Sequence, residues 1–119
     1  MSEPENNAAP LAQLPSLLRL EATIAARRGG DVASSYVAKL SARGTAKIAQ
    51  KLGEEAVEAV IAAMAGDRAG LIGESADLLF HWMVLLADQG IALAEVMAEL
   101  DAREGVGGLV EKAARGADA

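Results

Sequence analysis

The sequence has no cysteine and a single histidine among its 119 residues. Without cysteine, disulfides, thiol nucleophiles and thiolate metal sites are excluded, and one histidine cannot build a His-rich zinc centre. Aromatic residues make up only 3% of the chain, and aromatic and β-branched residues are the types that sheets favour. This composition argues against a sheet-based fold.

Long uninterrupted apolar runs are also absent, so we expect no membrane-spanning helix and no membrane partner. The polar, acidic N-terminus is unlike a secretory signal or a transit peptide, and a cytoplasmic location is therefore expected. The formal charge of −6 predicts that nucleic acid is not a partner. A small phosphorylated ligand is compatible with this charge if a metal ion or a local lysine cluster neutralises its phosphates.

Alanine, in contrast, fills 27 positions, and alanine and leucine are strong helix formers. The length suits one domain, and short loops between apolar-striped segments predict an all-α antiparallel bundle of four to five helices. We assign this domain to residues 16–104. Residues 1–15, which contain all three prolines, are expected to form a flexible N-terminal arm, and residues 105–119 a loose C-terminal tail.

Apolar periodicity and glycine positions place the helices at about residues 17–28, 35–43, 45–65, a long segment ending near 89, and 93–104. Ser16 and Thr45 are predicted N-caps. Gly66 and Asp67 predict a tight turn between the two long helices, because they combine a C-terminal glycine with an N-cap aspartate.

Several apolar residues are expected in the core. They include Leu17, Leu20 and Ile24 in the first helix, Ile48, Leu52, Val57, Val60, Ile61 and Met64 in the first long helix, and Tyr36, Trp82 and the methionines.

The informative polar residues lie on the two long helices. Glu54 and Glu58 share one stripe of the first helix with Lys47 and Lys51, and Glu55 lies beside that stripe. On the second helix, Glu74, Asp77 and His81 follow spacings of three and four. Counted from the turn, Glu58 is level with Glu74, and Glu55 with Asp77.

These carboxylates are therefore expected to converge, and the alternative is that they lie on a solvated face. The helix after Glu74 is apolar on nearly every side, so we expect Asp77 and His81 not to lie on an open face. Converging carboxylates repel unless something compensates. A hard divalent cation suits oxygen ligands, which predicts Mg²⁺, with Mn²⁺ as substitute, bound by Glu55, Glu58, Glu74 and Asp77.

The lysines and the histidine each allow two interpretations. Lys51 can pair with Glu55 on a helix surface, whereas Lys47 is followed four residues on by a like charge. Both lysines can instead contact phosphate oxygens, and the two interpretations stay open on the residues alone. His81 is interpreted as a supporting residue that hydrogen-bonds and orients Asp77 rather than as a base.

The spacing Glu55-x-x-Glu58 and Glu74-x-x-Asp77 resembles the ExxE…ExxD signature of the all-α nucleoside triphosphate pyrophosphatases, the MazG-like superfamily. Within that superfamily, roughly residues 14–104 resemble the phosphoribosyl-ATP pyrophosphatase family. The segments that carry this closer resemblance are Ser35-Tyr36-Val37-Ala38-Lys39-Leu40, Lys51-Leu52-Gly53-Glu54-Glu55-Ala56-Val57-Glu58, Glu74-Ser75-Ala76-Asp77-Leu78-Leu79-Phe80-His81 and Leu85-Leu86-Ala87-Asp88-Gln89-Gly90.

The resemblance implies Mg²⁺-dependent hydrolysis of phosphoribosyl-ATP, a small nucleotide, to phosphoribosyl-AMP and pyrophosphate in histidine biosynthesis. It also implies that Glu54 or Glu55 takes a proton from water, that Lys39, Lys47 and Lys51 bind phosphate, and that two chains form a homodimer. The sequence departs from the family pattern at Arg43, where lysine is common, and at Phe80, where tyrosine is usual. The alternatives are a pyrophosphatase for another, noncanonical nucleotide and a non-catalytic helical interaction module.

Overall fold

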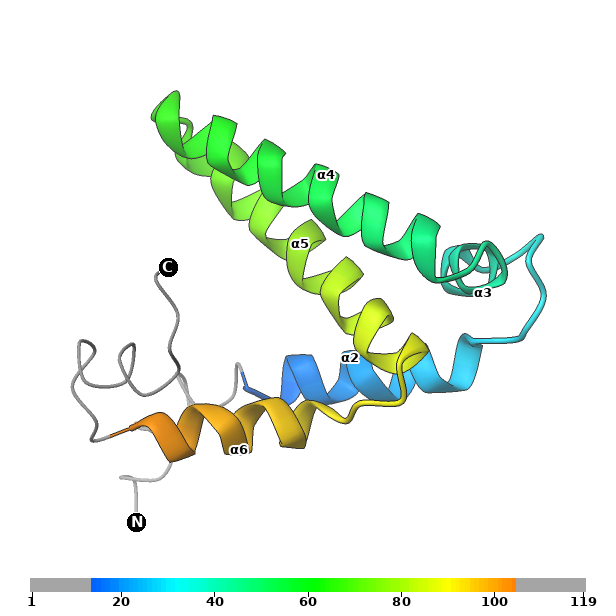
Figure 1. Ribbon diagram of the computed structural model, residues 1–119. Helices are drawn as coiled ribbons and strands as arrows, with labels where there is room; N and C mark the ends of the chain where they lie inside the picture. Colours follow the sequence, from blue (N-terminus) through cyan, green and yellow to red (C-terminus); the bar gives the residue numbers. More distant parts are fainter. Residues whose placement is uncertain (1–13, 105–119) are drawn as a thin grey trace, which may run out of the picture.

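The computed structural model describes residues 14–104, and within that range it contains five helices and no strand. The helices are α2 (Leu14–Arg27), α3 (Tyr36–Ala42), α4 (Thr45–Met64), α5 (Arg68–Asp88) and α6 (Leu93–Arg103) (Figure 1). The all-α prediction is confirmed, and each helix begins and ends within a few residues of the expected position. The expected arm and tail lie outside the described residues, apart from residues 14 and 15, which belong to α2.

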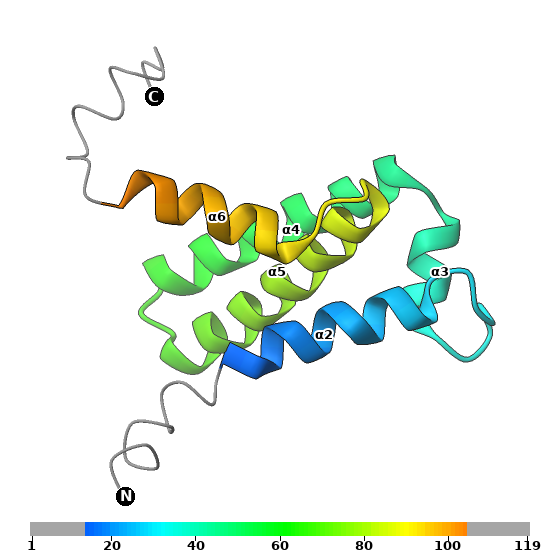
Figure 2. The ribbon, with the colours of Figure 1, turned by 90° about the horizontal axis from the view of Figure 1, so that it is seen from below.

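The two long helices form an antiparallel hairpin, α4 running beside α5 in both views (Figures 1 and 2). Their turn is built as predicted. Gly66 takes a positive φ of 69°, which glycine adopts without strain, and the Asp67 amide donates to the Ala62 carbonyl at 3.0 Å. The Asp67 carboxylate then caps α5 by accepting from the Gly70 amide at 2.9 Å. These bonds satisfy backbone groups that helix ends leave open.

Two predicted caps are wrong. α2 begins at Leu14, so Ser16 lies inside its first turn, where the hydroxyl accepts from Arg19 at 3.3 Å. Gly44 is the N-cap of α4, and no side chain caps that end. The Thr45 hydroxyl instead donates to the Asp88 carboxylate at 2.6 Å, a long-range contact that a local capping rule does not anticipate. It ties the start of α4 to the end of α5.

The core lies at one end of the hairpin, where α2, α3, the start of α4, the second half of α5 and the first residue of α6 meet. Ile24, Ile48 and Val84 are fully buried at its centre. The remaining buried members are Val37, Leu40, Met83, Leu86 and Leu93, and the expected residues Leu17 and Leu20 pack against them. Figure 1 shows the turn end of the hairpin projecting away from α2 and α6. Among the described helices, none therefore covers the half of the hairpin next to the turn.

The apolar residues of that projecting half are exposed, contrary to expectation. Val57, Val60, Ile61 and Met64 lie on one face of α4 at helical spacing, and each is more than half exposed. We call these four residues the α4 apolar stripe. Tyr36 is also outside the core, with 49% exposure, whereas Met83 is buried and Trp82 packs against the core. Periodicity identified an apolar face correctly but not what covers it.

α5 also qualifies the expectation that no helix spans a membrane. Within the described residues it is the one helix whose length and mean hydropathy of 1.3 would suit a membrane span. Core helices of soluble proteins meet the same criterion. Its apolar sequence is interrupted by three polar residues, Glu74, Asp77 and His81. Glu74 faces two glutamates of α4.

Candidate active site

Three carboxylates meet between α4 and α5. Glu55 and Glu58 project from α4 and Glu74 from α5, and one carboxylate oxygen of each lies within 4.8 Å of the other two. Glu55 is buried, Glu74 is half-buried and Glu58 is exposed. We call these three residues the acidic cluster. Of the four carboxylates expected to converge, the structure brings these three together.

Asp77 is not part of this cluster. Its side chain is exposed, and the expectation of a largely buried α5 is wrong, because only His81, Met83, Val84 and Leu86 are buried on that helix. α5 faces α4 with one side and the core with part of its second half. In the first half of α5, the apolar side that faces away from α4 is not covered by another element of the described residues. The exposed Asp77 lies in this half of the helix.

The acidic cluster has the properties of a cation site. Glu55 Oε1 and Glu74 Oε1 are buried and have no hydrogen-bond partner among residues 14–104, although a buried acceptor without a partner is costly. The pKa of Glu58 is raised by Glu74 in two ways. A hydrogen bond with the Glu74 carboxyl favours the protonated form of Glu58, and the like charge of Glu74 disfavours the ionised form. An all-oxygen set of this kind fits a hard divalent cation such as Mg²⁺ or Mn²⁺.

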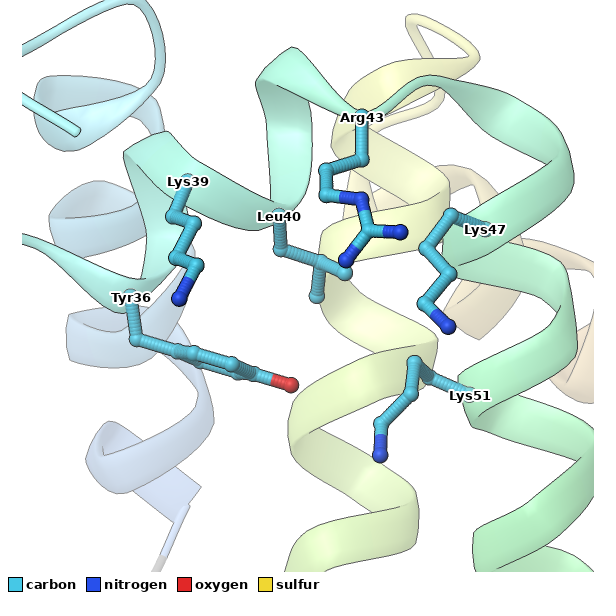
Figure 3. Close-up of a pocket in the computed structure, with 6 residues that line it drawn as sticks. All are labelled: Tyr36, Lys39, Leu40, Arg43, Lys47 and Lys51. Atoms are coloured by element: carbon cyan, nitrogen blue, oxygen red, sulfur yellow. The ribbon is translucent and has the colours of Figure 1, made fainter.

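A basic cleft of about 240 Å³ lies beside the first turns of α4. It is lined by Tyr36, Lys39, Leu40, Arg43, Lys47 and Lys51. Figure 3 shows the nitrogen ends of the four cations pointing toward the space around the Tyr36 hydroxyl. The structure thus brings together Lys39, Lys47 and Lys51, the three lysines suggested as phosphate ligands.

Among the cations that line the basic cleft on α4, Lys51 lies nearest in the helix to the acidic cluster. Its ammonium lies 3.4 Å from Glu54 rather than pairing with Glu55, because Glu55 turns inward toward α5. Glu54 also accepts from the Gln50 amide at 2.8 Å. The hydrogen bonds from Gln50 and Lys51 lower the pKa of Glu54, and the contact with Glu54 raises the pKa of Lys51.

His81 supports the cleft rather than the Asp77 carboxylate. Its Nδ1 donates to the Asp77 backbone carbonyl at 2.8 Å, which fixes the proton on that nitrogen. With that proton on Nδ1, Nε2 accepts from the Tyr36 hydroxyl at 3.0 Å. His81 is buried at 5% exposure, so the Tyr36 hydroxyl is held from behind by a rigid group.

The comparisons with known proteins agree with this arrangement. A family model described as phosphoribosyl-ATP pyrophosphohydrolase matches residues 17–104, which is most of the chain and includes the whole acidic cluster and basic cleft. The chain belongs to the phosphoribosyl-ATP pyrophosphohydrolase family. The resemblance inferred from the motifs is thereby confirmed.

Three curated relatives show how closely the chain follows this family. Each is named phosphoribosyl-ATP pyrophosphatase. The relative from Rhizorhabdus wittichii is 69% identical over 84% of this chain and 94% of its own length. That from Novosphingobium aromaticivorans is 65% identical over 83% and 92%, and that from Erythrobacter litoralis is 60% identical over 85% and 97%.

The sequence analysis missed Tyr36 and Arg43 as residues of this site. It interpreted Tyr36 as a core residue and Arg43 only as a departure from the family pattern. A signal for Arg43 was present, because Lys39, Arg43, Lys47 and Lys51 recur every four residues. The break at Gly44 hid it, since residues on either side of a helix break need not share a face. Phe80, the other departure, keeps an aromatic contact by stacking on Tyr36 with ring centroids 5.9 Å apart.

Proposed function

We propose that this chain hydrolyses phosphoribosyl-ATP between its α and β phosphates, releasing phosphoribosyl-AMP and pyrophosphate in the second step of histidine biosynthesis. The observation that carries the proposal is the acidic cluster, with its two buried and unpartnered oxygens, in a chain of the phosphoribosyl-ATP pyrophosphohydrolase family. The reaction needs charge neutralisation and positioning more than a covalent nucleophile. We also propose a cytoplasmic location.

Glu55, Glu58 and Glu74 would hold Mg²⁺, or Mn²⁺ in its place, and we propose Asp77 as a fourth ligand. When bound, the ion would neutralise the triphosphate and activate water. Glu54 and Glu55 are the proposed proton acceptors. They differ in their surroundings, because Gln50 and Lys51 already occupy the Glu54 carboxylate, whereas Glu55 Oε1 has no partner.

The cations of the basic cleft are proposed to bind phosphate. Lys39, Lys47 and Lys51 are long side chains that reach the same space, and charge-assisted contacts of this kind are short and strong. His81 contributes indirectly by holding the Tyr36 hydroxyl at the wall of the cleft.

The proposal is tested by incubating the purified chain and Mg²⁺ with phosphoribosyl-ATP and, in parallel, with a panel of noncanonical deoxynucleoside triphosphates. Selective pyrophosphate release from phosphoribosyl-ATP is expected, together with growth of a histidine auxotroph that lacks this step. Preference for a deoxynucleotide would identify a different pyrophosphatase. No release from any nucleotide would leave a non-catalytic helical module.

Saturating Mg²⁺ or Mn²⁺ is expected to raise the melting temperature, because an ion that binds only the folded state stabilises it by mass action. The increase should be roughly 10 °C at a concentration about 100 times the dissociation constant. Ca²⁺ should bind and yet support little turnover, since its coordination is looser. Differential scanning fluorimetry at constant ionic strength measures the shift.

The matched control for this measurement is the Glu55→Gln, Glu74→Gln double variant, whose melting temperature should not respond to metal. If the wild-type protein also fails to respond, with and without nucleotide present, the metal assignment is wrong.

We also propose a homodimer in which a second copy covers the α4 apolar stripe. Contiguous exposed apolar residues of this kind mark interaction surfaces. A groove runs along the α4 apolar stripe and is lined by Gln50, Gly53, Glu54, Val57, Glu58 and Ile61. The stripe is continuous with the acidic cluster through Glu58. The partner copy would therefore cover the half of the hairpin that α2 and α6 leave open.

Introducing charges at Val60 and Met64 should dissociate this dimer. The variant Val60→Glu, Met64→Glu is expected to raise the dissociation constant at least about a hundredfold, because it buries two like charges that cannot pair with each other in the interface. Light scattering after size exclusion gives the mass. Leu18→Glu, which alters an equally exposed apolar residue on α2, should remain dimeric. A monomeric wild-type protein at high concentration would contradict the proposal.

A further inference from the structure

Nearby carboxylates neutralise only part of the positive charge of the basic cleft. Lys51 pairs with Glu54, but no carboxylate in the described part of the chain lies at ion-pair distance from Lys39, Arg43 or Lys47. Like charges that share a cleft repel one another, and an anionic ligand removes this repulsion. In a chain whose formal charge is −6, this local excess of cations indicates an anion-binding site.

The volume of the basic cleft limits what it can hold. Pockets that enclose a whole small ligand usually measure about 300–1,000 Å³, whereas this cleft measures about 240 Å³ and is open to solvent. It therefore accommodates one end of a nucleotide rather than all of it.

The basic cleft begins near the acidic cluster and extends away from it along α4. Lys51, which lines the cleft, precedes Glu55 by about 6 Å along the helix axis, while Lys47 precedes it by eight residues, which is about 12 Å. In the proposed reaction the bond that is broken lies at the acidic cluster. Lys51 is therefore assigned to the triphosphate, and the remaining cations of the cleft, Lys39, Arg43 and Lys47, are available for another anion.

Phosphoribosyl-ATP contains such an anion. The phosphoribosyl group is attached to the adenine base and carries its own monophosphate, separated from the triphosphate by two sugars and the base. We infer that the basic cleft binds this second phosphate through Lys39, Arg43 and Lys47. The inference rests on the proposed function and adds to it the feature that distinguishes the substrate from ATP.

The chemistry of the cleft fits a terminal phosphate. The Arg43 guanidinium offers paired donors that match two phosphate oxygens, and the two lysines add charge from α3 and α4 (Figure 3). The Tyr36 hydroxyl gives its proton to His81, so its oxygen is free to accept from a hydroxyl of the adjoining ribose. A monophosphate far from the acidic cluster has no metal ion of its own and depends on these side chains.

The test compares two substrates: phosphoribosyl-ATP and the same molecule without its second phosphate. For the variants Arg43→Gln and Lys47→Gln, kcat/KM for phosphoribosyl-ATP should fall by roughly 10- to 150-fold, the range expected for a lost charged hydrogen bond. For the dephosphorylated substrate, kcat/KM should stay unchanged. Arg43→Lys should keep part of the preference, because it retains the charge but not the paired donors.

A second measurement uses the wild-type protein and the Arg43→Gln variant with phosphoribosyl-AMP and AMP as inhibitors. The wild type should bind phosphoribosyl-AMP more tightly, and the variant should lose most of this preference, because Lys39 and Lys47 remain. Arg19→Gln on α2, which removes the same charge away from the cleft, should behave as wild type in both experiments.

Equal losses for both substrates would assign the basic cleft to the triphosphate or the leaving pyrophosphate and overturn the inference, as would unchanged kinetics in the cleft variants. Failure of the wild-type protein to hydrolyse phosphoribosyl-ATP is a separate outcome. It would refute the proposed function, and with it this inference.

Discussion

Glu58→Gln should reduce turnover of phosphoribosyl-ATP by more than about a hundredfold while leaving the protein folded. Residues that merely support a metal ligand change affinity or activity by about 10- to 100-fold when they are altered, and loss of a ligand itself should exceed that range. Glutamine keeps the shape of the side chain and removes only its charge. Steady-state pyrophosphate release at saturating Mg²⁺ measures the effect.

The melting temperature of the metal-free variant separates this interpretation from misfolding. Glu74 raises the pKa of Glu58 because the two carboxyls lie close together, so removing one charge relieves repulsion. The metal-free variant should therefore melt at the wild-type temperature or above it. Glu99→Gln on α6, away from the acidic cluster, should keep full activity. Wild-type turnover by folded Glu58→Gln would remove the metal hypothesis.

Asp77→Asn extends the comparison to the carboxylate that lies outside the acidic cluster. Because Asp77 is proposed as the fourth metal ligand, this variant should lower turnover as strongly as Glu58→Gln. Unchanged turnover would contradict that role.

The arrangement of Glu58 and Glu74 could be predicted because it depends on local rules. Gly66 and Asp67 specify the turn through backbone conformation and a side-chain cap, and helical geometry then fixes which residues lie level across the hairpin. The same logic gave the positions of all five described helices. Local sequence therefore determines where the helices that carry the site begin and end and how the two long helices are joined.

Exposure could not be predicted in the same way, because it depends on elements distant in sequence. The stripe from Val57 to Met64 has the spacing of a core face, yet α2 and α6 pack over the other end of the hairpin. Asp77 is likewise predicted to lie away from solvent, because the helix around it is apolar on nearly every side, but no described element covers it. Tyr36 is aromatic, which predicts a core position, but its hydroxyl contacts His81, 45 residues away in the sequence, and no local pattern shows that contact.

Lys51→Met should lower kcat/KM by roughly 10- to 150-fold, the range expected for loss of a charged hydrogen bond to phosphate. The structure places Lys51 in a surface ion pair with Glu54, and exposed pairs of this kind contribute little to stability. A lysine that only pairs on the helix surface would therefore leave the kinetics intact when it is replaced. A lysine that contacts the triphosphate would not.

The substrate comparison distinguishes Lys51 from the rest of the basic cleft. Because Lys51 lies about one helical turn from Glu55, its loss should affect phosphoribosyl-ATP and the analogue lacking the second phosphate equally, unlike the loss of Arg43. Lys112→Met is the matched control, since it makes the same chemical change outside the residues that the family model matches. If Lys51→Met and Lys112→Met have the same kinetics, Lys51 serves only the ion pair with Glu54.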